Sequence, residues 1–62
     1  MCEANAYLLK GDQQELIMES VDILRPEEGK VYIQDIFGGQ RWVEGRIKEM
    51  NLVQHRILLT QD

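Results

Sequence analysis

KVYIQDIFGG, residues 30–39, gives the clearest indication of β structure in the chain. Apolar and polar residues alternate along it, and successive side chains of a strand point to opposite faces. Val31, Ile33 and Phe37 therefore share one face. We predict a strand over residues 30–37, and the two glycines that follow it predict a reversal of the chain.

The length of that reversal sets the register of the next strand, expected over residues 41–50. A two-residue loop would place Val31 opposite Arg46, whereas a three-residue loop over Gly38–Gln40 would place Val31 opposite Ile47. We favour the second register, because it pairs apolar with apolar side chains on a face that has to be buried.

The rest of the chain indicates further short strands, since ten residues are valine or isoleucine and no apolar period of 3.6 residues is sustained. We expect these strands at residues 2–9, 15–20, 21–24 and 55–60, and the segment 21–24 either follows the strand before it or continues it. Turns are expected at 11–12 and 26–29 and a loop at 51–54. The strand over 2–9 would place Cys2, Ala4, Ala6 and Leu8 on one face. The predicted fold is all-β, a single domain over residues 1–62. It would be a small barrel or a strongly curved antiparallel sheet of five to seven strands, because such strands limit exposed edges by closing or curling.

Size and composition limit the classes of protein to which the chain can belong. A chain of 62 residues buries only about 60% of the surface that it exposes when unfolded, so pairing with a second copy is expected to stabilise it. A single cysteine excludes an intrachain disulfide and fits a reducing compartment. There is no apolar run of membrane-spanning length and no secretory signal at the start, so we expect a cytoplasmic protein without membrane association.

Charge argues against nucleic-acid binding, because the formal net charge is -4 and such binding depends on neutralising phosphates. Residues 40–62 are the less acidic part, and Arg46 and Lys48 could form a basic stripe there, so a small RNA-binding module remains the alternative. Catalysis is not expected, since the lone histidine, His55, has no catalytic motif around it.

Cys2 is the most unusual candidate for chemistry, because it lies next to the initiator methionine. A thiolate is a soft ligand for nickel, copper or zinc. If Met1 is removed, the amine and the thiolate of Cys2 can close a five-membered chelate ring. If Met1 stays, the amide nitrogen of Cys2 is the available donor. Two copies related by a two-fold axis would supply two sulfurs and two nitrogens, a set that suits square-planar nickel(II) or copper(II) better than tetrahedral zinc.

Each of the two candidate ligands also has a simpler interpretation. Free cysteine is also a common small buried hydrophobe, and on chemistry alone that role of Cys2 is the commoner one. His55 could join a metal site, although a lone histidine at the start of a strand is more often a surface residue.

The ordered set of residues along the chain resembles the CooT family of small nickel-binding proteins, over essentially the whole length. The residues that carry this resemblance are Met1-Cys2-Glu3-Ala4, Leu8, Val21-Asp22-Ile23, Phe37-Gly38, Gly45, Ile47, Asn51-Leu52, His55, Ile57 and Leu59. One departure is the turn after Phe37-Gly38, where Gly39, Gln40 and Arg41 stand in place of the acidic residues that members often carry.

The resemblance implies a homodimer that binds Ni(2+) through the cysteine next to the initiator methionine, here Cys2 with its backbone nitrogen. It also implies a metallochaperone or store linked to maturation of a nickel enzyme such as carbon monoxide dehydrogenase, which would be the client. The fold implied is an Sm-like or SH3-like barrel, and the family is labelled in places as RNA-binding. With the resemblance added, a metal-binding role for Cys2 becomes the preferred interpretation.

Overall fold

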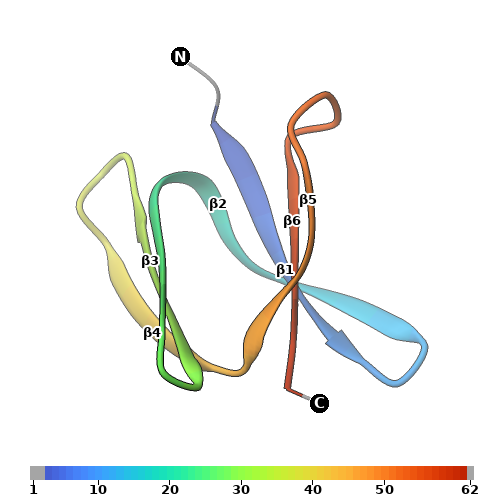
Figure 1. Cartoon of the computed structure of the whole chain (residues 1–62). Helices are drawn as coiled ribbons and strands as arrows, with labels where there is room; N and C mark the ends of the chain where they lie inside the picture. Colours follow the sequence, from blue (N-terminus) through green and yellow to red (C-terminus); the bar gives the residue numbers. More distant parts are fainter. Residues whose placement is uncertain (1–2, 62) are drawn as a thin grey trace.

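Six strands make up the structure, a computed structural model that describes residues 3–61. They are β1 (Ala4–Lys10), β2 (Gln13–Glu27), β3 (Lys30–Asp35), β4 (Gln40–Glu44), β5 (Arg46–Asn51) and β6 (Arg56–Thr60). All six belong to one sheet in the order β4-β3-β2-β1-β6-β5 (Figure 1). The prediction of an all-β fold with five to seven strands is confirmed. Within residues 3–61 no helix is of a length and apolarity to cross a membrane.

The sheet is mixed and open, so two parts of the predicted architecture are wrong. β1 and β6 pair in parallel, while the other four pairings are antiparallel. β6 runs parallel to β1 because the β5–β6 hairpin turns the chain back beside the start of β1, where Asn5 N donates a hydrogen bond of 2.9 Å to His55 O. β4 and β5 follow one another in the chain, yet they form the two edges of the sheet, which is therefore neither a closed barrel nor strongly curled.

β2 is one long strand of 15 residues, so the segment predicted over 21–24 continues the strand predicted over 15–20. Its first part pairs with β1 and its second part with β3. Between them, Ser20 adopts a φ of 56°, a left-handed conformation that locally kinks the strand and shifts the register. The turn after β2 is also shorter than predicted, because Pro26 still pairs with Val31 and only residues 28–29 make the reversal.

The register between β3 and β4 differs from both predicted registers, since Val31 lies opposite Val43. The reversal begins earlier than the glycines indicate because the Asp35 side chain closes it. Asp35 Oδ1 accepts hydrogen bonds from Phe37 N at 2.9 Å and from Gly39 N at 2.8 Å. Phe37 is therefore at the tip of the turn and 86% exposed, instead of sharing the buried face of Val31.

The core lies on one face of the sheet and draws on five of its strands. Ala4, Ala6 and Leu8 are buried together, as the alternation along β1 predicts, whereas Cys2 of the same predicted face lies outside the described residues. The other members of this cluster are Val21, Val31, Ile33, Val43, Ile57 and Leu59.

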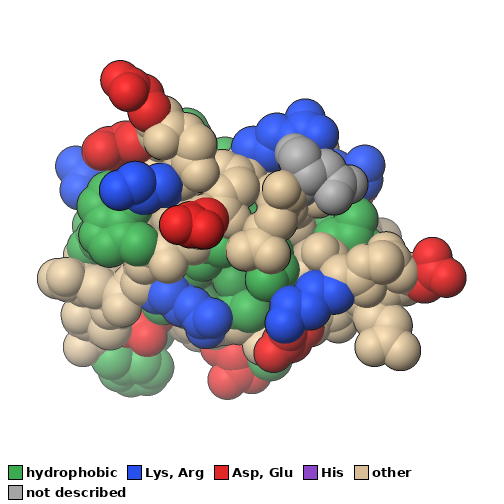
Figure 2. Space-filling model, turned by 90° about the horizontal axis from the view of Figure 1, so that it is seen from below, with side chains coloured by type: hydrophobic (Ala, Val, Ile, Leu, Met, Phe, Trp, Pro, Cys, Tyr) green, Lys and Arg blue, Asp and Glu red, His purple; other side chains and the backbone are tan. Residues whose placement is uncertain are grey.

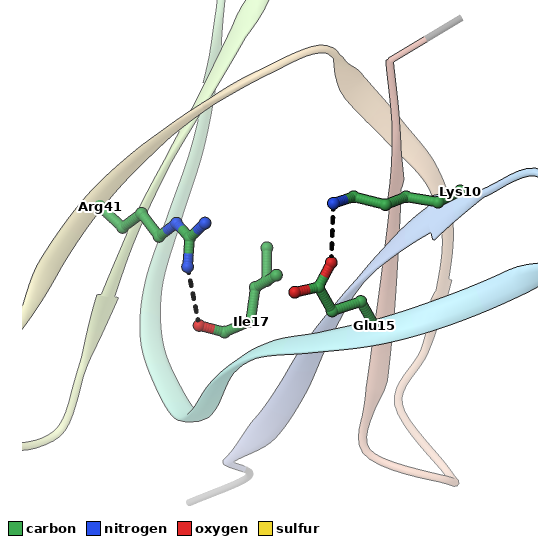
Figure 3. Close-up of polar contacts among 4 residues, drawn as sticks. All are labelled: Lys10, Glu15, Ile17 and Arg41. Atoms are coloured by element: carbon green, nitrogen blue, oxygen red, sulfur yellow. Dashed lines mark hydrogen bonds and ion pairs between the residues drawn. The ribbon is translucent and has the colours of Figure 1, made fainter.

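One long polar side chain connects β4 to β2, and an ion pair links the two strands of the β1–β2 hairpin. Arg41 Nη1 donates to Ile17 O at 3.4 Å, and Lys10 Nζ lies 2.9 Å from Glu15 Oε1 (Figure 3). Lys10 lowers the pKa of Glu15 by this hydrogen bond and by its charge, and Arg41 contributes a smaller effect in the same direction. These groups are exposed, so they contribute little to stability.

Candidate metal centre at the start of β1

The first candidate ligand, Cys2, lies outside the described residues, so the structure gives only the surroundings of the segment that follows it. The description begins at Glu3, which is exposed, and β1 begins at the next residue. The start of β1 lies at the same end of the molecule as the β3–β4 turn and the β5–β6 loop (Figure 1). Segments far apart in the sequence therefore lie at the same end of the molecule as the start of β1 (Figure 1).

Asn5 joins these segments by hydrogen bonds from its backbone and its side chain. Its N–H donates to His55 O, and its Oδ1 accepts from Ser20 N at 3.2 Å. Ser20 O in turn accepts from Ile36 N at 3.1 Å. The start of β1 thus has the β5–β6 loop on one side and the β2 kink with the β3–β4 turn on the other. Sequence reasoning gave Asn5 no role, because a lone asparagine in a predicted strand carries no signal for such bridging.

His55, the second candidate ligand, lies beside the start of β1, where its backbone carbonyl accepts a hydrogen bond from Asn5 N. The residue is exposed and has a φ of 56°, in the left-handed region. The sequence predicts the strand itself to begin at this residue, whereas β6 begins one residue later. Within residues 3–61, no three histidine, cysteine or acidic side chains converge in a metal-binding arrangement, so His55 is near the start of β1 without belonging to a ligand cluster there.

The two loops beside the start of β1 expose large apolar side chains. Phe37 is 86% exposed and Val53 89%, and Ile36 and Leu52 are exposed beside them. Each loop is fixed by a side chain that accepts backbone hydrogen bonds. Asp35 does so in the first loop, and in the second Asn51 Oδ1 accepts from Gln54 N at 3.0 Å. The exposure of these residues could not be read from the sequence, which placed Phe37 in the core.

The basic stripe that Arg46 and Lys48 could have formed is not a regular row. Both residues are exposed on β5, but an irregularity between Ile47 and Glu49 breaks the alternation of side chains at Lys48. At the opposite end from the start of β1, the surface shows acidic and basic side chains interspersed around apolar ones, without a field of one sign (Figure 2).

An aromatic cluster on the outer face of β2, β3 and β4 is a feature that sequence reasoning did not assemble. The rings of Tyr32 and Trp42 lie opposite one another with centroids 5.1 Å apart. Arg25 lies 4.9 Å from the centroid of Tyr32, and Lys30 lies 5.5 Å from that of Trp42. Opposed positions on β3 and β4 become visible only with the correct register, which was not the predicted one.

Comparison with known proteins decides the family. The model of the family described as "CO dehydrogenase accessory protein CooT" matches residues 1–60. The chain belongs to the CooT family. The matched range includes both candidate ligands, Cys2 and His55, and it confirms the resemblance noted from the sequence.

Two individual proteins are similar to this CooT family chain over nearly its full length. A crystal structure described as that of a putative CooT from Carboxydothermus hydrogenoformans is 43% identical, with a TM-score of 0.90 and 98% of each chain covered. The uncharacterized protein MJ1551 of Methanocaldococcus jannaschii is 34% identical over 59 residues, which cover 95% of this chain and 96% of that protein. The overall fold of this chain is thus shared with an experimentally determined structure.

Proposed function

We propose that this CooT family chain binds Ni(2+) through Cys2 at the interface of a homodimer. It would act as a cytoplasmic, non-catalytic nickel chaperone or store for maturation of a nickel enzyme such as carbon monoxide dehydrogenase. The observation that carries this proposal is the match to the CO dehydrogenase accessory family over residues 1–60, a range that includes the Met1-Cys2 start.

The chemistry of Cys2 explains why two copies are needed. One chain has a single cysteine and a single histidine, so it can offer one thiolate and the nitrogens close to it. A two-fold axis near Cys2 doubles this set to two sulfurs and two nitrogens, which complete a planar site. Each chain acts as one domain that presents its N-terminal end to the other. We propose no ligand role for His55 and use it as the control position.

Nickel affinity should fall as the pH falls, because the thiol of Cys2 has to lose its proton to become a ligand. The same requirement gives a spectroscopic signature, since a nickel–thiolate bond produces a sulfur-to-nickel charge-transfer band. A site built from carboxylates would lack that band.

The test is titration of the wild type, Cys2→Ser and His55→Gln with Ni(2+), followed by the charge-transfer band and by calorimetry. We expect Cys2→Ser to lose the band and the tight binding, and His55→Gln to keep both. Tight binding unchanged in Cys2→Ser would remove Cys2 from the site. A matching loss in His55→Gln would make the histidine a ligand.

A further inference from the structure

Asn5 lies three residues after Cys2 and is hydrogen-bonded to two different segments of the chain where β1 enters the sheet. We propose that Asn5 is a positioning residue for the metal ligand, because its side chain fixes the start of β1, from which the Cys2 segment extends. The nickel part of this inference rests on the proposed function, whereas the structural part does not.

The pairing of β1 with its two neighbouring strands changes at Asn5. The parallel ladder with β6 begins at this residue. The antiparallel ladder with β2 shifts its register there, since Ala4 pairs with Val21 but Ala6 pairs with Met18. Two residues of β2 thus face one residue of β1, which is the arrangement of a β-bulge. Before Asn5, the described part of β1 pairs with β2 alone, so Asn5 is the first residue of the strand that is held from both sides.

The side chain of Asn5 bonds to the backbone of this bulge. Its Oδ1 accepts a hydrogen bond of 3.2 Å from Ser20 N, in the bulged part of β2. A backbone N–H that is shielded from water needs an acceptor, and in a regular ladder a carbonyl of the facing strand supplies it. Because β2 has an extra residue here, a side chain takes the place of that carbonyl. The attachment of β2 to the start of β1 therefore depends on one side-chain oxygen.

The two backbone partners of Asn5 share an uncommon conformation. Ser20 and His55 each have a φ of 56°, and within residues 3–61 they are the only non-glycine residues with a positive φ. This left-handed conformation is unfavourable for a residue with a Cβ, and it persists where the surrounding structure holds the residue in place. Asn5 bonds to both of them, through Oδ1 to Ser20 N and through its own N to His55 O. The two strained residues of the chain therefore meet at one residue of β1.

The short separation along the chain connects Asn5 with the metal. Only two residues stand between Cys2 and Asn5, so their Cα atoms are at most about 11 Å apart in an extended chain. A ligand binds more tightly when its position is set in advance, because less conformational entropy is lost on binding. Groups that orient a ligand without touching the metal contribute about 10–100-fold to metal affinity. A fixed Asn5 narrows the space that the Cys2 thiolate can reach and so favours nickel binding.

The test compares Asn5→Ala with Asn5→Asp, and Gly29→Ala is the control for a general loss of stability. Alanine removes the acceptor of the Ser20 N–H and leaves the backbone bond to His55 O, whereas aspartate keeps an acceptor oxygen. Gly29 is in the β2–β3 turn, at the opposite end of the sheet from the start of β1 (Figure 1). Titration with Ni(2+), under conditions in which circular dichroism shows each variant to be folded, gives the affinity. NMR gives the exchange rate of the Ser20 amide and the backbone relaxation of Glu3.

We expect Asn5→Ala to weaken nickel binding by at least about tenfold and to speed the exchange of the Ser20 amide. Asn5→Asp should restore both, and Gly29→Ala should bind nickel as the wild type does. Wild-type affinity in Asn5→Ala, or an equal loss in Gly29→Ala, overturns the positioning role. Aspartate also adds a negative charge, so an affinity that recovers without slower exchange of the Ser20 amide is a charge effect and overturns the role too.

Cys2→Ser separates this inference from the proposed function. If Cys2→Ser loses nickel binding while Asn5→Ala keeps it, the proposed function stands and this inference fails. If Cys2→Ser binds nickel as the wild type does, or the wild type binds none, the proposed function fails and the relaxation of Glu3 decides the role of Asn5. Larger motion of Glu3 in Asn5→Ala than in Gly29→Ala then supports that role, and equal motion in the two variants overturns it.

Discussion

Gly45, at the corner between β4 and β5, should be far less tolerant of alanine than Gly29, at the turn between β2 and β3. Gly45 has a φ of +132°, and a Cβ added there would lie 2.2 Å from Thr60 O and 3.0 Å from Thr60 C. Gly29 also has a positive φ, +74°, but a Cβ there would meet nothing within 4 Å. Alanine at the two positions therefore separates the cost of the backbone conformation from the cost of a close contact with neighbouring backbone.

The magnitude follows from these two terms. A non-glycine residue in a conformation that only glycine adopts readily costs about 1–3 kcal/mol. Relief of a clash with a fixed backbone costs about 1–3 kcal/mol more. A chain of this length has a free energy of unfolding of about 3–9 kcal/mol, from roughly 0.05–0.15 kcal/mol per residue. Gly45→Ala should thus remove about two thirds of the stability, whereas Gly29→Ala should cost about 1–2 kcal/mol, since only the left-handed conformation is penalised there.

The assay is urea denaturation followed by the fluorescence of Trp42, the single tryptophan of the chain. All variants have to be compared at one chain concentration, because association with a second copy would add to the apparent stability. A free energy of unfolding for Gly45→Ala within about 0.5 kcal/mol of the wild type, near the size of ordinary surface changes, would refute the reasoning. A larger loss in Gly29→Ala than in Gly45→Ala would refute it as well.

Two further predictions concern polar side chains. Asp35→Ala should lower the free energy of unfolding by about 1–2 kcal/mol, because it removes two hydrogen bonds that close the β3–β4 turn, and Asp35→Asn, which keeps an acceptor oxygen, should lose less in the same urea assay. Lys10→Met should raise the pKa of Glu15 toward its ordinary value, and Arg41→Met should raise it less, as an NMR titration of the carboxyl group would show; equal shifts would contradict the geometry. Since Lys10 lowers the folded-state pKa, its stabilising effect is present above the unfolded pKa of Glu15 and is lost as the pH falls through the folded value.

Local features of the fold were readable from the sequence because they depend on neighbouring residues. Alternation placed Val31 and Ile33 in the core, and the same period correctly placed Ala4, Ala6 and Leu8. The β3–β4 register was not readable, because a carboxylate of Asp35 starts the reversal before the two glycines that signal it. No local pattern distinguishes that carboxylate from any other acidic residue in a strand.

The long-range pairing of β1 with β6 could not be predicted from the sequence, for a different reason. The parallel ladder joins Asn5 to Arg56 across most of the chain, and the residues of both strands would suit an antiparallel neighbour equally well. The prediction of a closed barrel was wrong for the same reason. After the corner at Gly45, β5 forms the far edge of the sheet, and no neighbouring residue in the sequence indicates where that edge lies.

The surroundings of the candidate site were predicted only in part, and its chemistry stays a prediction. Cys2 stands out by its position in the sequence, and its ligand role stays a prediction because it lies outside the described residues. His55 was named without a reason to lie nearby, and a backbone hydrogen bond to Asn5 provides that proximity. The exposed apolar side chains of the two loops were not predicted, because the alternation along the strand places Phe37 in the core until the turn is placed correctly.

Native mass spectrometry of the nickel-loaded protein tests the central claim most directly. The proposed site requires a species of two chains with one nickel ion in the wild type. Cys2→Ser should show no such species under the same conditions, whether or not its chains still associate. A wild-type spectrum in which one nickel ion is carried by a single chain, or a Cys2→Ser spectrum with the same loaded dimer, would contradict the claim that nickel is held by Cys2 from two chains.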